Sequence, residues 1–395
     1  MGRHAKMQDS SLDHALEQAL ERWAALLPRV CQRFTDSAPA PAEVQRPHTV
    51  DRPAPAPSSR WQERVTIDDH LLNSTLTYLR RGTSGTPEFD DERTQFLLAL
   101  GRDFRKFGAE AEHYPHLAQS IRQSLCELTG GSPGAAELGE LVDLACHLMA
   151  LGADNDAESG RPATVHATVL QVDRRSPDVT VVRLQMDPPT PWWSGQFIEA
   201  QTPYTPHAWR YYSPAIPFNP DGLAELHIRA VGESSRAIAE QANKGDVWII
   251  GASYGHIRAS GERPVVMIAG STGLAPLRAL ILDLSLLPDP PRVRLFWGAR
   301  TTAGLYELDS LMGMASAWPW LEVVAISEHL ERDASPSHPV RTGTAVEVAC
   351  NELAAEDNLE HTEILVAGNR HMIANAARAL LDLGANPDLL RFDQH

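Results

Sequence analysis

Hydrophobic positions in the first part of the chain recur every three or four residues, which places them on one face of a helix. The spacing predicts helices over residues 11–34, 61–81, 90–107, 113–128 and 135–151. Six prolines between positions 39 and 57 interrupt the pattern and predict a flexible loop over about residues 37–60. We therefore predict an all-α domain over residues 1–152.

A different pattern follows residues 153–162, which are polar and acidic and predict a linker. Short runs rich in β-branched residues, with partial alternation, then predict strands over residues 165–172, 179–186, 195–200, 209–213, 224–230 and 247–250. One helix is expected over about residues 234–242. Six short strands with one helix predict a closed antiparallel β-barrel over residues 163–260.

The last part of the chain alternates apolar strands with helices. Strands are expected over residues 264–270, 293–298, 321–326 and 363–368, and an apolar helix runs to Leu287 after the first of them. Continuous apolar strands separated by helices indicate a parallel sheet with helices on both faces. The pattern predicts an α/β domain over residues 261–395.

Composition narrows the range of functions. The chain has 395 residues and a net charge of −16, which makes nucleic acids and anionic membranes poor partners. No apolar run is long enough to span a bilayer, and the N-terminal residues lack a signal-peptide core. The cysteines Cys31, Cys126, Cys146 and Cys350 are widely spread, which argues against a disulfide framework. We expect a cytoplasmic protein.

Candidate chemistry gathers at residues 209–214, Trp-Arg-Tyr-Tyr-Ser-Pro. Arg210 supplies a permanent charge and a planar fork suited to a diphosphate. Tyr211 or Tyr212 can cover one face of a flat ring, and Ser213 can donate a hydrogen bond to a ring nitrogen. The stretch predicts a flavin cradle, although an ordinary edge strand has the same composition.

Two predicted helix starts offer further sites for phosphate. Ser234 and Ser235 open the helix of the barrel, where they can bind phosphate or serve only as an N-cap. The first strand of the α/β domain ends in a Gly/Thr turn that leads into a helix, an arrangement that lets the backbone approach phosphate closely. This turn contains Gly270, Thr272, Gly273, Leu274, Ala275 and Pro276.

The order of the barrel motifs resembles the flavin domain of the ferredoxin–NADP reductase family. The resemblance implies that Arg210 and Ser235 contact phosphate, that Tyr212 stacks on the flavin ring, and that Ser213 lies near the flavin N5. It also implies that Gly195 and Gln196 form a turn under the cofactor. Tyr212 and Ser213 are the candidate catalytic residues.

Three further motifs resemble the NAD(P) domain of the same family: the turn at residues 270–276, Phe-Trp-Gly-Ala-Arg ending at Arg300, and Ala-Gly-Asn-Arg-His-Met-Ile with Gly368 and Asn369. Ala367 and Asn369 stand where the family has cysteine and proline. Asp393 stands where relatives have an acid, and His395 where they have an aromatic residue. The choice between NADH and NADPH stays open, with NADH favoured.

Residues 96–108 and 112–115 resemble the proximal-helix region of actinobacterial flavohaemoglobins, a subgroup that Trp209 also fits. Phe104 stands at the position of the histidine that ligates haem iron in that family, and phenylalanine has no lone pair to donate. The resemblance therefore implies a degenerate globin-like domain without haem and without a metal ligand at Phe104. His70, His113 or His147 could substitute as ligand, or could be ordinary core and surface histidines.

Three functions follow as hypotheses. The first is an FAD-dependent NAD(P)H oxidoreductase that passes electrons to a small molecule or a protein. The second is a nitric oxide dioxygenase of the flavohaemoglobin type with an unusual haem ligand. The third is a flavoprotein sensor or docking module with little turnover.

Overall fold

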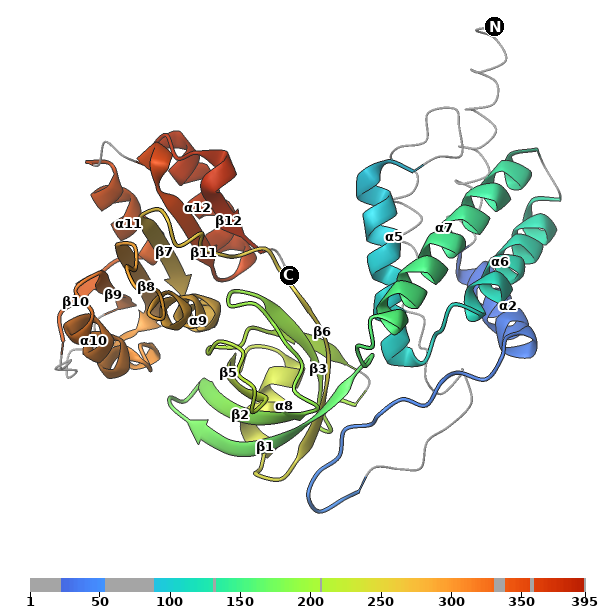
Figure 1. The fold of residues 1–395 in the computed structure, drawn as a ribbon, viewed down its shortest axis with the longest axis horizontal. Coiled ribbons are helices and arrows are strands. Elements are labelled where there is room, and N and C mark those ends of the chain that lie inside the picture. Colours follow the sequence, from blue (N-terminus) through green and yellow to red (C-terminus); the bar gives the residue numbers. More distant parts are fainter. Residues whose placement is uncertain are drawn as a thin grey trace, which may run out of the picture. The chain divides into compact units, whose positions relative to one another are not determined.

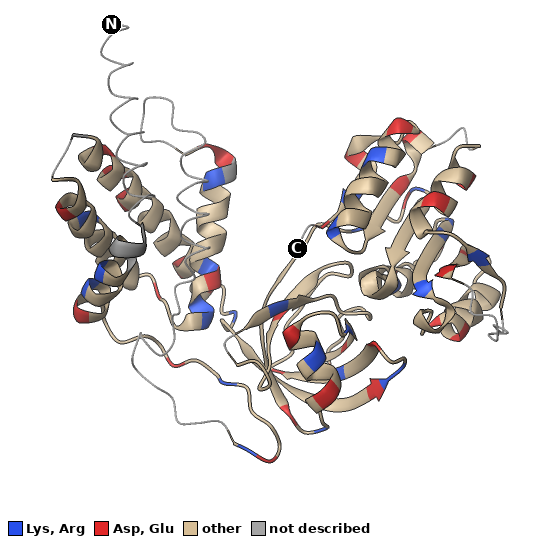
Figure 2. Ribbon diagram, turned by 180° about the vertical axis from the view of Figure 1, so that it is seen from behind, with Lys and Arg blue, Asp and Glu red and all other residues tan. Residues whose placement is uncertain are grey.

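The computed structural model describes residues 23–53, 89–130, 133–206, 208–329, 338–355 and 359–393 (Figure 1). The chain divides into two compact units. The first comprises Met1–Gln45 and Pro55–Thr164, and the second comprises Arg46–Ala54 and Val165–His395. Charged residues of both signs occur on the elements of each unit (Figure 2). Within the described residues, no helix has the length and apolar character needed to cross a membrane.

The first unit is helical in all its described elements. These are α2 (Trp23–Ser37), α5 (Asp91–Phe104), the short 3-10 helix η1 (Arg105–Phe107), α6 (His113–Thr129) and α7 (Pro133–Glu158). The expected helix over residues 61–81 and the start of the one over 11–34 lie outside the described residues. α5 and α7 approach closely because Gly101 and Gly152 have no side chains: a Cβ on Gly101 would lie 1.9 Å from the Met149 carbonyl oxygen.

Helix α7 is longer than the sequence pattern predicts. It continues to Glu158, so the first six residues of the expected linker 153–162 are helical. The acidic residues that suggested a linker have a different role here, because Asp156 is largely buried and pairs with Arg105 and Arg161. Ala153 is also buried in the helical core. The connection to the second unit is therefore shorter than expected.

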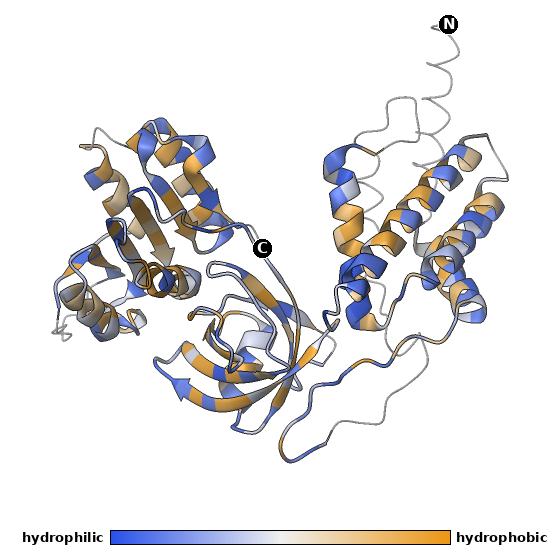
Figure 3. Ribbon diagram, in the orientation of Figure 1, coloured by the Kyte–Doolittle hydropathy of each residue, from blue (hydrophilic) through white to orange (hydrophobic). Residues whose placement is uncertain are grey.

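The barrel has the predicted strands. They are β1 (Val165–Arg174), β2 (Val179–Asp187), β3 (Phe197–Gln201), β4 (Trp209–Tyr212), β5 (Leu223–Arg229) and β6 (Val247–Tyr254), with α8 at Glu233–Gln241. All pairs are antiparallel, in the order β4-β3-β6-β1-β2-β5. A bridge between Pro214 and Leu226 joins the two outer strands. Apolar and polar residues alternate along β1 and β2, as expected for strands with one buried face (Figure 3).

Part of the proline-rich stretch belongs to this barrel. His48 forms an antiparallel bridge with Val247, and the backbone amide of Val50 donates to Asp246 at 2.9 Å. We call Arg46–Ala54 the strap. The expectation of a loop within a domain of residues 1–152 is therefore corrected for this segment, because it groups with the second unit, where the backbone of His48 and Val50 forms hydrogen bonds.

The α/β domain has a six-stranded parallel sheet in the order β10-β9-β8-β7-β11-β12. The strands are β7 (Val265–Gly270), β8 (Val293–Thr301), β9 (Leu321–His329), β10 (Val340–Thr342), β11 (Glu363–Ala367) and β12 (Leu390–Phe392). Helices α9 (Leu274–Leu284) and α10 (Leu308–Ala317) pack on one face, and α11 (Ala345–Leu353) and α12 (Arg370–Asp382) on the other. The predicted parallel sheet is confirmed, and the short edge strands β10 and β12 add to it.

Candidate functional site: a cleft in the second unit

A cleft of about 910 Å³ lies where the barrel meets the α/β domain. Its floor includes the carboxyl ends of β7 and β11, which are neighbours in the sheet although the chain runs from β7 to β8. In open parallel sheets ligands bind at such a switch in strand order. The cleft is lined by sixteen of the eighteen residues expected to bind cofactor: Gly195, Arg210, Tyr211, Tyr212, Ser213, Ser234, Ser235, Gly270, Thr272, Gly273, Ala275, Pro276, Arg300, Gly368, Asn369 and Asp393.

The two other expected residues do not line it. Gln196 accepts a hydrogen bond from the backbone amide of Trp193 at 2.9 Å and so shapes the turn before β3. Leu274 is fully buried in the core beneath α9. Their neighbours Gly195 and Gly273 do line the cleft, so each motif reaches the cleft while one of its side chains points elsewhere.

The barrel wall carries the Arg-Tyr-Tyr-Ser stretch along β4. Arg210 is exposed, and its Nη1 donates to the carbonyl of Trp209 at 2.8 Å. Burial raises the pKa of Tyr212 to about 12, although the charge of Arg210 opposes this shift. The Tyr212 phenol is therefore neutral at physiological pH and offers an uncharged aromatic face.

The turn before β3 depends on a glycine. Gly195 has a φ of 94°, and a Cβ at this position would lie 2.1 Å from the Ile257 carbonyl oxygen. Ile257 is buried and also lines the cleft. Only glycine fits this backbone path without displacing a wall of the cleft.

The start of α8 forms the next part of the wall. Ser235 Oγ accepts hydrogen bonds from the amides of Val231 and Gly232 at 3.1 and 3.0 Å, so it caps the helix. Ser234 is buried and its hydroxyl lies 3.1 Å from Thr205 Oγ1. These contacts fix a helix N-terminus at the cleft, where amide groups and the helix dipole attract anions.

The floor of the cleft is built from backbone at the ends of β7 and β11. A Cβ on Gly273 would lie 2.2 Å from the Ala367 carbonyl oxygen, and one on Gly270 or Gly368 would lie within 2.6 Å of Met372 Sδ. Asn369 caps α12 by accepting from the Met372 amide at 2.9 Å. The glycines therefore bring the backbone of two strand ends together beside the N-termini of α9 and α12.

The C-terminal segment completes the cleft. Asp393, which follows β12, accepts from the His256 amide at 2.8 Å through Oδ1. Its Oδ2 is buried and has no hydrogen-bond partner among the described residues, which leaves an acceptor that a bound molecule could use. His395 lies outside the described residues.

Sequence reasoning missed six charged or titratable residues of the cleft: His227, Arg229, Glu233, Glu328, Glu347 and His371. Glu347 forms a capping box with Thr344, and hydrogen bonds from the Thr344 backbone and side chain lower the pKa of its carboxyl group. The Thr-x-x-Glu spacing was readable in the sequence. His227 carried no such signal, since its partners come from distant parts of the chain.

Comparison with known families agrees with this geometry. Residues 166–258 match the oxidoreductase FAD-binding domain, and residues 267–378 match the oxidoreductase NAD-binding domain. The chain carries an FAD-binding domain and an NAD-binding domain of the oxidoreductase type. The two matched segments are the barrel and the α/β domain, whose walls enclose the cleft.

Individual relatives resemble this FAD/NAD module over part of their length. The phenol hydroxylase P5 protein of Acinetobacter pittii (strain PHEA-2) is 34% identical over 157 residues, which are 39% of this chain and 44% of the relative. The ferredoxin–NAD(P)(+) reductase CarAd of Metapseudomonas resinovorans is 27% identical over 239 residues, 58% of this chain and 68% of the relative. The chain spans about half the length of the first of these curated relatives.

Solved structures show the same fold. The ferredoxin reductase in carbazole 1,9a-dioxygenase is 27% identical with a TM-score of 0.52, over 58% of this chain and 69% of that one. The flavohemoglobin from Malassezia yamatoensis, which was solved with bound FAD and heme, has a TM-score of 0.67 at 14% identity, over 98% of each chain. The second similarity is one of fold alone.

Proposed function

We propose that the protein is an FAD-dependent NAD(P)H oxidoreductase that passes electrons from the nicotinamide nucleotide, through flavin, to an acceptor. The observation that carries this proposal is a cleft lined by residues of both domains. Residues 210–213 come from the FAD-binding domain, and Thr272, Gly273, Ala275 and Pro276 come from the NAD-binding domain. A cleft shared by two such domains brings two cofactors together, as hydride transfer requires.

The residues fit these cofactors in charge and shape. Arg210 and the N-terminus of α8 at Ser234 and Ser235 would hold the FAD diphosphate, and the glycine-walled turn at residues 270–273 would admit the nucleotide backbone. Bound FAD supplies the redox chemistry by accepting hydride from the reduced nicotinamide. Tyr212 would cover the flavin ring as a neutral phenol, and Ser213 would donate a hydrogen bond to a ring nitrogen.

We further propose that the nucleotide is NADH. Arg300 lines the cleft together with two carboxylates, Glu328 and Glu347, and the hydrogen bonds from Thr344 keep Glu347 ionised. The additional phosphate of NADPH would meet these negative charges. The expected result is a higher kcat/KM with NADH than with NADPH, and a smaller difference in Glu347→Gln; a preference for NADPH would contradict the proposal.

The acceptor is proposed to be a small molecule or a protein. The relatives include a protein named as the reductase component of a phenol 2-monooxygenase and others named as ferredoxin reductases, which supports a protein acceptor. Cys126, Cys146 and Cys350 are free thiols, which supports a reducing compartment such as the cytoplasm.

For the helical unit we propose a degenerate globin-type fold that does not bind haem. Phe104 ends α5 and packs in the helical core. Of the possible substitute ligands, His113 uses Nδ1 to accept from the Glu110 amide at 2.8 Å, and its Nε2 lies 3.4 Å from the Ala40 carbonyl oxygen. His147 is exposed. His70 lies outside the described residues.

An absorption spectrum of the protein from haem-replete cells, followed by anaerobic addition of NADH, tests these proposals together. We expect flavin bands that NADH bleaches rapidly, and steady turnover when an artificial acceptor such as ferricyanide is added. A Soret band would instead support the nitric oxide dioxygenase hypothesis. Flavin that NADH does not reduce would support the sensor or docking function.

A further inference from the structure

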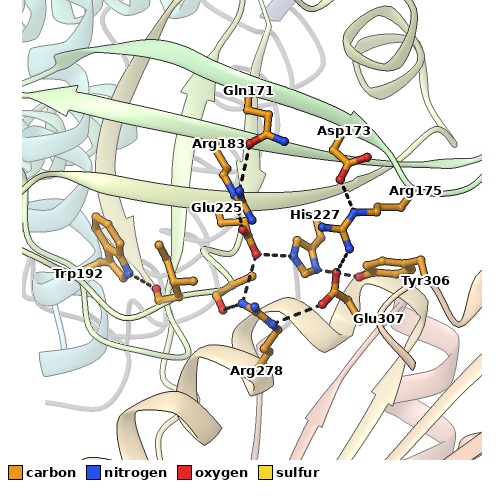
Figure 4. Close-up of polar contacts among 12 residues, drawn as sticks. Gln171, Asp173, Arg175, Arg183, Trp192, Glu225, His227, Arg278, Tyr306 and Glu307 are labelled. Carbon is orange, nitrogen blue, oxygen red and sulfur yellow. Dashed lines mark hydrogen bonds and ion pairs between the residues drawn. The ribbon is translucent and has the colours of Figure 1, made fainter. Parts of the chain in front are cut away.

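A buried group of charged and polar side chains crosses from the barrel to the α/β domain beside the cleft (Figure 4). We call it the cross-domain network. Glu225 and His227 lie on β5 of the barrel, whereas Arg278 lies on α9, and Tyr306 and Glu307 precede α10. Arg175 and Arg183 of the barrel complete it through ion pairs with Glu307 and Glu225, respectively.

Arg278 joins α9 to two segments of the barrel. Its Nη1 donates to the Ala215 carbonyl at 2.7 Å and lies 3.2 Å from Glu225 Oε1. Its Nε lies 3.8 Å from Glu307 Oε2, which is an ion pair without a hydrogen bond. Only 12% of the Arg278 side chain is exposed, so these contacts are made largely out of water.

The hydrogen-bond roles around His227 follow from the charges of its neighbours. Burial would raise the pKa of Glu225, but hydrogen bonds from His227 and Arg183 and the charge of Arg278 lower it to about 2. Burial raises the pKa of Tyr306 well above its ordinary value, so its phenol is neutral. Ionised Glu225 accepts from His227 Nε2 at 3.2 Å, and Tyr306 donates to Nδ1 at 2.9 Å.

The network lies directly beside both halves of the cleft. Arg278 is in the same helix as Ala275 and Pro276, which line the nucleotide side. Ala215, whose carbonyl oxygen accepts from Arg278, lies two residues beyond Ser213. The antiparallel bridge between Pro214 and Leu226 also makes Ser213 and His227 neighbours across β4 and β5, and both residues line the cleft.

We propose that Arg278 is a positioning residue for hydride transfer: it fixes the nicotinamide-binding end of α9 against the flavin-binding segment that contains Ser213. This inference rests on the proposed function. A buried ion network is by itself weak evidence for stability. The role of Arg278 follows instead from the two segments that it joins. Its hydrogen bond to Ala215 links the two halves of the cleft through one side chain.

The chain offers a matched control. Arg183 also pairs with Glu225, at 2.8 Å, but comes from β2 of the same barrel, and among the described residues it has no ion pair or hydrogen bond with the α/β domain. Arg278→Met and Arg183→Met each remove one cation from Glu225, and only the first removes a link between domains. Arg278→Lys keeps the charge and should recover part of the loss.

The experiment measures hydride transfer by stopped-flow reduction of the flavin with saturating NADH. In Arg278→Met we expect a rate lower by about tenfold to a hundredfold, since small misplacements of reacting groups have effects of this size, with FAD content unchanged. Arg183→Met should stay within about twofold of the wild type. Equal rates in the wild type and Arg278→Met, or equal losses in both variants, would overturn the proposal.

A second readout does not depend on turnover. Hydrogen exchange of the protein as purified should be faster at the amides of Leu274, Ala275, Leu277 and Arg278 in Arg278→Met and unchanged in Arg183→Met. Tyr306→Phe, which removes the hydroxyl next to His227, provides a milder variant if Arg278→Met folds poorly; it should raise exchange in residues 305–308. Unchanged exchange in all variants would refute the coupling, whereas failure of NADH to reduce the wild type would refute the proposed function alone.

Discussion

Replacing Gly195 by alanine tests how closely the cleft wall is fitted to its backbone. The new Cβ would lie 2.1 Å from the Ile257 carbonyl oxygen, 0.9 Å inside the 3.0 Å limit that real Cβ contacts respect. The positive φ of 94° costs alanine about 1–2 kcal/mol. Forcing two packed segments apart adds about 1–3 kcal/mol. We therefore expect Gly195→Ala to lose about 2–5 kcal/mol of stability.

Gly245 is a control with the same backbone conformation. Its φ is also 94°, but a Cβ there would meet the Val50 side chain at 3.4 Å from Cγ2 and 3.5 Å from Cβ, without the overlap seen at Gly195. Gly245→Ala should therefore lose only the conformational cost of about 1–2 kcal/mol. Urea unfolding followed by flavin fluorescence and circular dichroism gives both values, and FAD per chain is measured on the purified proteins.

The two variants should also differ in cofactor content. Displacement of Ile257 moves a wall of the cleft, so Gly195→Ala should retain less FAD than the wild type, and Gly245→Ala should retain as much. Equal stability losses with full FAD content in both variants would show that the close approach at Gly195 is not needed for the site.

Three further predictions concern single side chains. Arg210→Ala should weaken FAD retention, since a charge-assisted hydrogen bond is worth about 1.5–3 kcal/mol; unchanged FAD affinity in a titration of apoprotein would remove Arg210 from the site. Ser213→Ala should keep FAD but slow its reduction by NADH, and equal stopped-flow rates would exclude a role in hydride transfer. The pKa of Glu225 is about 2 in the folded protein, below its ordinary 4.5. Its stabilising contribution is therefore full above pH 4.5 and lost as the pH falls toward 2. Glu225→Gln should reduce stability at neutral pH and flatten the acid limb of a stability–pH curve; an unchanged acid limb would contradict this assignment.

The strands of the barrel could be predicted because alternation and β-branched residues reflect local burial. The edge strands β10 and β12 could not be predicted. Each has three residues, and a hydrophobic pattern this short does not distinguish a strand from a loop. The extension of α7 was missed for another reason. Asp156 suggested a solvated linker, and its partner Arg105 lies 51 residues away in the chain.

The cleft residues were predicted through short ordered motifs, in which backbone requirements and charge lie close together in sequence. Gln196 and Leu274 do not line the cleft, and this could not be predicted because a motif does not say which of its members face inward. The cross-domain network was beyond sequence reasoning, since Arg183, Glu225, Arg278 and Glu307 come from separate elements of two domains. Only the folded chain brings such charges together.

The strap at Arg46–Ala54 has a consequence for how this protein can be divided. The chain leaves the helical unit, pairs with β6 through His48, and returns before it enters β1. A gene fragment that begins at the linker would encode the FAD/NAD half without one of its own segments, and Asp246 would lose the Val50 amide. Recombination at one junction would therefore separate the strap from the rest of the second unit, so the helical unit and the FAD/NAD half are expected to be inherited as a pair.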